Sequence, residues 1–203
     1  WTTIPVPSNW ELQGFGDYNY GHDKVKANEQ GTYRYRFQAP ANWRQRQVNI
    51  VFDGVMTDAE VKINGRPAGE VHQGGFYRFK YDIGRLLRNG SNLLEVKVSK
   101  MSANASVNRA ERSGDFWVFG GIYRPGFLEV KPLIHIDRVA INAGANGDFS
   151  VNTFTRPLPA GYSLSAQVFT MDGKAVQDAV TLPGDANGDV NTNTNGKVYT
   201  LKQ

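Results

Sequence analysis

The sequence predicts an all-β protein made of β-sandwiches, and three observations support this prediction. Apolar and polar residues alternate with a period of two in one segment after another, as in the stretch from Tyr33 to Phe37. Each alternating segment ends at turn-forming residues, of which Asn64-Gly65 is one example. Short strands separated by such turns are typical of a sandwich rather than of a helical or parallel α/β fold.

The first part of the chain contains five alternating segments. They cover residues 33–37, 48–52, 61–63, 77–81 and 94–98. Asn64-Gly65 is the strongest turn signal among them, because both central residues of a two-residue hairpin turn adopt positive φ. Between the last two segments, Ile83, Leu86 and Leu87 have the spacing of one short helical turn, which Gly90 would end.

Pro132 marks the expected boundary between two domains, residues 1–132 and residues 133–203. A new series of strands opens at Ile134-His135-Ile136 and is separated by turns. The further strands are expected at residues 149–153, 164–168 and 198–201. Their spacing is typical of an immunoglobulin-like sandwich. Because about 70 residues is short for that fold, we expect the second domain to be cut short at Gln203.

The composition supports a buried core and excludes several classes of site. Of the 203 residues, 40% are apolar, and the net charge of +4 comes from scattered basic residues. Arg34 and Arg36, in the densest basic region, alternate along a strand and are expected on a solvated face, so no nucleic-acid partner is predicted. The chain has no cysteine, which excludes disulfides, thiolate zinc sites and cysteine nucleophiles.

No apolar run approaches the ~18 residues of a membrane helix, and no membrane partner is predicted. The chain begins at Trp1 without a signal peptide, as a processed chain would. The expected location is the periplasm or the exterior of a bacterial cell.

The glutamates do not form a recognisable catalytic pair. Glycoside hydrolysis needs two carboxyl groups, ~5–5.5 Å apart for retention or ~6.5–9.5 Å apart for inversion. Most of the glutamates stand beside other polar residues and are expected to be solvated surface groups; they are Glu11, Glu29, Glu60, Glu70, Glu95, Glu111 and Glu129. Nucleophile elbows, phosphate loops and dinucleotide-binding turns are also missing. The chain alone is therefore predicted not to be an enzyme.

The most informative stretch is Ser113 to Arg124, where an acidic residue stands among aromatic ones. The carboxylate of Asp115 could accept two hydroxyl hydrogen bonds, while an aromatic face such as that of Trp117 matches the C–H face of a pyranose. In the alternative interpretation, Phe116, Trp117 and Phe119 belong to the core and Asp115 caps a turn.

Six blocks of the chain resemble glycoside hydrolase family 2 enzymes and follow in that family's order. The first is Val6-Pro-Ser-Asn-Trp-Glu-Leu-Gln-Gly-Phe-Gly16, and the last is Asp115-Phe-Trp-Val-Phe-Gly-Gly-Ile-Tyr-Arg124. The four between them are residues 52–55, 61–65, 79–83 and 90–94. The resemblance implies a jelly-roll (galactose-binding-like) sugar-binding domain, followed more weakly by an immunoglobulin-like one. It is strongest to bacterial β-galactosidases.

This resemblance implies roles for individual residues. In family β-galactosidases, the Asp of the last block reaches into the active site of the following barrel, contacts glycone hydroxyls and helps to hold a sodium ion. By motif match this residue is Asp115, and a comparable Asp occurs in the β-glucuronidase branch. A family Asn falls near His22, which offers one donor or acceptor where an amide offers both. Trp117 completes the expected substrate-binding residues, and Asp115 is the expected metal ligand.

The implied function is that of a non-catalytic N-terminal part of a family 2 exo-β-glycosidase, expected to be a β-galactosidase. It would brace a downstream (β/α)₈ barrel of ~250 residues, which carries the catalytic glutamates, and would help to recognise a β-linked carbohydrate. Two other hypotheses stay open: a free-standing carbohydrate-binding module or lectin, and a sandwich that serves only in domain packing.

One further segment has a pattern of oxygen ligands. Asp185-Ala-Asn-Gly-Asp-Val-Asn191 has the alternate spacing of a calcium loop, but it lacks Gly at the sixth position and Glu at the twelfth. A polar hairpin loop is the preferred interpretation.

Overall fold

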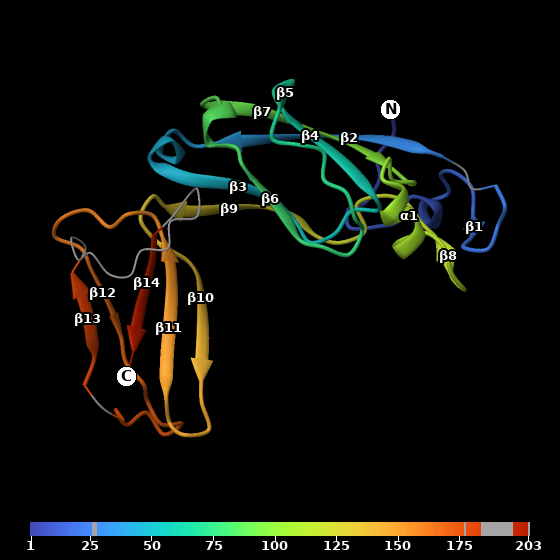
Figure 1. The fold of residues 1–203 in the computed structure, drawn as a ribbon. Helices are drawn as coiled ribbons and strands as arrows, with labels where there is room; N and C mark the ends of the chain where they lie inside the picture. The colour runs from blue at the N-terminus through green and yellow to red at the C-terminus, as the bar shows by residue number, and fades with distance from the viewer. Residues whose placement is uncertain (26–27, 177, 184–196, 203) are drawn as a thin grey trace. The chain divides into compact units, whose positions relative to one another are not determined.

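The computed structural model describes residues 1–25, 28–176, 178–183 and 197–202. The chain divides into two units, Trp1–Val130 and Lys131–Gln203, and strands dominate both (Figure 1). The predicted all-β class is confirmed. The division falls after Val130, two residues before the Pro132 boundary expected from the sequence. None of the helices in the described ranges is long and apolar enough to cross a membrane.

The first unit is a sandwich of two antiparallel sheets. One has four strands in the order β2-β7-β4-β5, and the other has three in the order β6-β3-β9. Their bounds are β2 Gln30–Ala39, β3 Arg46–Phe52, β4 Asp58–Ile63, β5 Arg66–Pro67, β6 Phe79–Asp82, β7 Gly90–Ser99 and β9 Gly126–Pro132. β2 and β7 pair along their whole length, from Gln30↔Ser99 to Ala39↔Gly90.

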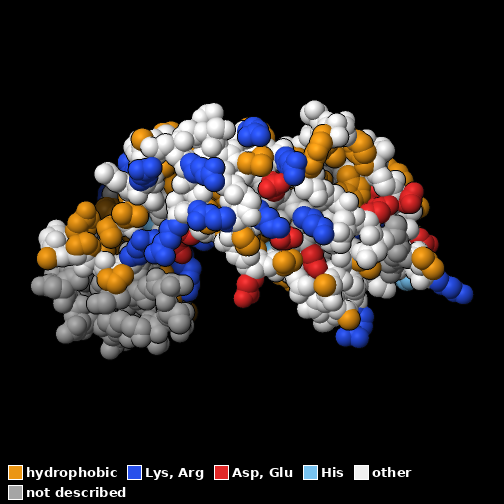
Figure 2. Space-filling view, turned by 90° about the horizontal axis from the view of Figure 1, so that it is seen from above, with side chains coloured by type: hydrophobic (Ala, Val, Ile, Leu, Met, Phe, Trp, Pro, Cys, Tyr) orange, Lys and Arg blue, Asp and Glu red, His pale blue; other side chains and the backbone are white. Residues whose placement is uncertain are grey.

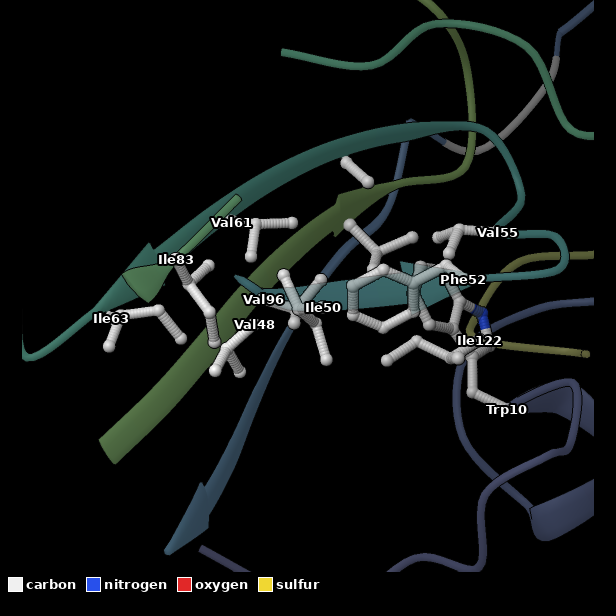
Figure 3. Packing of buried hydrophobic residues seen from close by; sticks show 12 residues of the cluster. Trp10, Val48, Ile50, Phe52, Val55, Val61, Ile63, Ile83, Val96 and Ile122 are labelled. Carbon is white, nitrogen blue, oxygen red and sulfur yellow. The ribbon is translucent and has the colours of Figure 1, made fainter. Parts of the chain in front are cut away.

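The core of the first unit lies between these two sheets. Alternate side chains of β3, β4 and β7 point inward, and Figure 3 shows Ile50, Val61 and Val96 facing one another. Trp10 and Phe52 close one end of the same cluster. Each such apolar side chain contributes about 1.5–3 kcal/mol when it is fully buried. In β4 and β7 the period-two pattern of the sequence corresponds to a more buried and a less buried face, whereas β3 is buried on both faces from Val48 to Phe52.

The predicted hairpin at Asn64-Gly65 is confirmed. The two residues connect β4 to β5 with φ values of 53° and 79°, as the primed hairpin turns require. The predicted helical turn near Ile83 is a 3-10 turn, η3 (Gly84–Leu86). Two further 3-10 turns are η1 (Glu11–Gln13) and η2 (Ala41–Gln45), and α1 (Ala105–Glu111) is an α-helix.

The outer face of the four-stranded sheet carries charges of both signs. Arg34 pairs with Glu95 at 2.9 Å, and Lys62 pairs with Glu60 at 2.6 Å. Figure 2 shows basic side chains spread over this side of the molecule with acidic and apolar ones between them. This is the solvated strand face that the alternation of Arg34 and Arg36 predicts.

The second unit contains two smaller sheets, in the orders β10-β11-β14 and β12-β13. Their strands are β10 Ile136–Ala143, β11 Phe149–Thr155, β12 Ser163–Ala166, β13 Val180–Pro183 and β14 Lys197–Lys202. The expected strand at residues 164–168 is too long, because β12 ends at Ala166 and Phe169 forms only an isolated bridge to Ala175. The calcium-loop pattern at residues 185–191 lies outside the described residues.

Candidate functional site

A short two-stranded ribbon joins two distant parts of the first unit. It consists of β1 (Asn19–Tyr20) and β8 (Trp117–Val118), which pair with Tyr20 opposite Trp117. The N–H of Gly21 extends the ribbon by donating to the Phe116 carbonyl at 2.7 Å. Gly21 also lies directly against the backbone of Gly114, where a Cβ atom would overlap the Gly114 carbonyl. The ribbon thus brings the segment that follows the first block of the sequence pattern against the last block.

Aromatic rings form a row along this ribbon. The Tyr20 ring lies between Trp117 and His22, with centroid distances of 5.4 Å and 5.7 Å in edge-to-face geometry. Tyr18 contacts Trp117 and Phe119 in the same way, at 6.1 Å and 6.0 Å. Each such pair contributes about 0.5–1.5 kcal/mol beyond the buried area, so the rings hold one another in place.

All three residues singled out in the sequence lie on or beside this ribbon. Asp115 and His22 are exposed, and Trp117 retains 55% of its surface. The alternative that Phe116, Trp117 and Phe119 belong to the core is wrong for the first two, which are 42% and 55% exposed, while Phe119 is half-buried. An exposed carboxylate beside exposed rings can accept hydroxyl hydrogen bonds while an apolar surface lies next to it.

Beneath the ribbon lies a network of buried charges. Lys100 Nζ is 2.9 Å from Glu11 Oε1 and 3.2 Å from Glu29 Oε2, and it donates to the Asp17 carbonyl at 2.5 Å. Arg112 is also buried, and its guanidinium donates to the Phe119 carbonyl. Burial lowers the pKa of Arg112, an effect that the negative charges of Glu111 and Glu11 oppose.

The expectation that the glutamates are solvated is wrong for two of them. Glu11 is 2% exposed and accepts from the Gly120 N–H, and Glu111 is 8% exposed and accepts from the Gly75 N–H at 2.7 Å. Their partners are dozens of residues away, so no local pattern reveals them. The position of Glu11 inside the apolar run Trp10-Glu11-Leu12 is the one signal of burial that the sequence offers.

A groove of about 1340 Å³ opens in the first unit, and Glu29 of the charge network lines it. Its walls include Trp1, Tyr35 and Phe127, together with the core side chains Ile50 and Phe52. None of the predicted site residues lines it. Glu29, Gln30 and Arg34 also line the groove, so its walls carry charged and polar groups besides the apolar ones.

Asp115 has the oxygen donors that hard cations take in proteins. Within the described ranges, no group of three or more His, Asp or Glu side chains lies close enough to hold a metal ion.

Comparison with known proteins gives one family. Residues 1–132 match the model described as "Glycosyl hydrolases family 2, sugar binding domain". A Beta-galactosidase of Psychromonas ingrahamii is 30% identical over 187 residues, which are 86% of this chain and 18% of that protein. A Beta-galactosidase of Clostridium acetobutylicum is 30% identical over 161 residues, which are 72% of this chain and 17% of that protein. The chain thus spans less than a fifth of the length of these relatives.

Solved structures share the fold. The Bacteroides uniformis beta-glucuronidase matches with a TM-score of 0.70 at 23% sequence identity. The match covers 100% of this chain and 24% of the beta-glucuronidase chain. A glycosyl hydrolase family 2 member of Bacteroides cellulosilyticus DSM 14838 matches with a TM-score of 0.67 at 20% sequence identity. The match covers 100% of this chain and 27% of the other chain.

Proposed function

The chain belongs to glycoside hydrolase family 2, and on that premise we propose that it is the non-catalytic N-terminal part of a β-glycosidase. It braces a catalytic barrel elsewhere in the longer protein and supplies side chains that bind the sugar at the non-reducing end. Two findings support this proposal. The family match covers the sugar-binding domain, and the relatives are named for glycosidase activity and are more than five times longer than the matched region.

The observation that carries the proposal is the exposed ribbon with Asp115, Trp117 and His22. The Asp115 carboxylate accepts hydrogen bonds from two sugar hydroxyls, which are stronger than bonds between neutral groups. The Trp117 ring packs against the C–H face of the sugar. His22 adds one directed hydrogen bond, as donor or acceptor according to its tautomer.

The favoured substrate is a β-galactoside, because the relatives from Psychromonas ingrahamii and Clostridium acetobutylicum, both 30% identical, are named Beta-galactosidase. A β-glucuronide is the competing substrate, since a relative from Formosa agariphila that is also 30% identical, over 142 residues, is named as a beta-glucuronidase. Rates on nitrophenyl β-galactoside and nitrophenyl β-glucuronide, measured side by side on the full-length protein, decide between them.

Asp115 is also the proposed ligand of a sodium ion shared with the barrel. One exposed carboxylate suits a shared ion, since the barrel would have to supply the remaining oxygen ligands. The proposed location is the periplasm or the exterior of a bacterial cell. A sodium titration of wild-type and Asp115→Asn activity tests the first point, and cell fractionation tests the second.

The main experiment is Asp115→Asn in the full-length protein. Loss of charge-assisted hydrogen bonds worth about 1.5–3 kcal/mol predicts a fall of about 10- to 100-fold in kcat/KM. Asp148→Asn is the matched control, because Asp148 is an exposed turn residue of the second unit that bonds locally to Asn146. Equal kinetics for Asp115→Asn and wild type would remove Asp115 from the site.

The isolated 203-residue chain is expected to hydrolyse neither substrate and to bind free sugar weakly. Hydrolysis by this chain alone would refute the assignment of the catalytic groups to another domain. Micromolar binding of galactose, measured by calorimetry, would instead favour a lectin.

A further inference from the structure

One peptide group, between Phe119 and Gly120, is held from both sides by buried charged side chains. The Arg112 guanidinium donates to the Phe119 carbonyl. Both oxygens of the Glu11 carboxylate accept from the Gly120 N–H, at 3.0 Å and 3.1 Å. Arg112 is 1% exposed and Glu11 is 2% exposed. We call Glu11 and Arg112 the 119–120 clamp.

The position of the clamp makes it relevant to the site. Arg112 stands immediately before the segment 113–118, and the peptide that it holds stands immediately after that segment. The side chain of Arg112 therefore ties the two ends of the segment that carries Asp115 and Trp117. Glu11 ties the same peptide to the first block, from which the chain continues into β1 and His22.

The segment needs such support because its contacts consist of the short ribbon and the ring contacts along it. Asp115, Phe116 and Trp117 are exposed, and strand β8 pairs over only two residues. A two-stranded ribbon this short is at best marginally stable by itself in water. Buried charges are also an inefficient way to stabilise a core, since well-packed apolar residues often do as well or better. A need to hold the 119–120 peptide group in a fixed geometry explains these buried charges better than a need for stability does.

We propose that Glu11 and Arg112 are positioning residues, which fix the 113–118 segment so that Asp115 and Trp117 meet the substrate in the correct geometry. This inference rests on the proposed function. A misplacement of about 1 Å in a substrate-positioning group can reduce the rate by about 100-fold. The clamp is therefore expected to act on substrate affinity without contacting the substrate.

The test uses Arg112→Met in the full-length protein, since methionine is unbranched and apolar and cannot donate to the Phe119 carbonyl. The expected result is a rise of about tenfold in KM with a smaller change in kcat, because the chemical groups are elsewhere. Arg112→Lys keeps a donor and should restore part of the lost affinity. Hydrogen–deuterium exchange should rise within residues 113–121 of Arg112→Met.

Asn92→Ala is the matched control for a purely structural role. Asn92 is also 1% exposed, and it holds the Arg88–Gly90 turn with several hydrogen bonds at the opposite end of β7 from Lys100. Its loss should lower stability without raising KM or exchange in residues 113–121. If Arg112→Met does not fold, Glu11→Gln replaces it, because the amide keeps one of the two oxygens that accept from the Gly120 N–H and loses the charge, so that it holds this peptide group more weakly.

The outcomes separate this inference from the proposed function. The proposed positioning role is overturned if a folded Arg112→Met variant has the KM of wild type and the hydrogen–deuterium exchange of wild type in residues 113–121. The same two results for a folded Glu11→Gln variant would also overturn it. A raised KM in Asn92→Ala equal to that in Arg112→Met also overturns it. If Asp115→Asn has wild-type kinetics, the proposed function fails, while the exchange measurement still reports on the clamp.

Discussion

The buried pair of Lys100 and Glu11 gives a sharp prediction of stability. The ammonium and carboxylate lie 2.9 Å apart, and both side chains are 0% exposed. Lys100→Met removes the cation with little change in shape and leaves the Glu11 carboxylate buried with the Gly120 N–H and the charge of Arg112 to stabilise it. Removing one partner of a buried pair destabilises a protein by about 3–5 kcal/mol.

Replacing the second charge should recover much of that loss. In the double variant Lys100→Met with Glu11→Gln, the fully buried carboxylate is gone, and the carboxylate that still faces the new apolar side chain is that of Glu29, whose side chain is 21% exposed to water. The glutamine oxygen can still accept from Gly120. We expect the double variant to be less stable than wild type by about 1–2 kcal/mol, and hence more stable than Lys100→Met alone. Such recovery is the coupling that a double-mutant cycle measures.

Urea unfolding of the 203-residue chain, followed by tryptophan fluorescence, provides the assay. All four tryptophans (Trp1, Trp10, Trp43 and Trp117) lie in the first unit, so the signal reports on that unit. With an m-value of about 2 kcal/mol/M, Lys100→Met should lower the midpoint by about 1.5–2.5 M. A double variant less stable than Lys100→Met would refute the reasoning, because it would mean that the two charges do not depend on each other.

Two further changes test the packing and the electrostatics of the first unit. Gly120→Ala should destabilise the first unit by about 1–3 kcal/mol in the same urea assay, because the new methyl group overlaps the Trp10 ring. The same ring also lies against Gly31. A midpoint equal to that of wild type would contradict this packing. Burial lowers the pKa of His72 below its ordinary 6.5, so the unfolded chain binds the proton more readily and stability falls as the pH drops below about 6.5. His72→Gln should reduce the difference in unfolding free energy between about pH 7.5 and about pH 5, and an unchanged difference would exclude His72 as its source.

The sequence alone determined the architecture, because strand periodicity and turn chemistry are local properties. Apolar residues at every second position give a strand one face to bury, whatever its partner is. Asn64-Gly65 specifies its turn through the positive φ of two adjacent residues. Strand ends were harder to predict: β12 stops at Ala166, before Val168, since the extent of pairing depends on the neighbouring strand.

The candidate site was likewise predicted in part from the sequence and decided in part by the tertiary structure. The sequence singled out Asp115, Trp117 and His22 by residue type and by likeness to a family. It did not show that Tyr20 lies between the rings of His22 and Trp117, because that depends on the register of β1 against β8.

Only the tertiary structure decided which charged residues are buried. Glu11 and Gly120 are 109 positions apart in the chain, and the carboxylate loses its water because Lys100 and the Gly120 N–H replace it. A charged side chain is stable in a protein interior where groups of opposite charge or hydrogen-bonding groups replace its water. Folding brings those partners together from separate strands and loops.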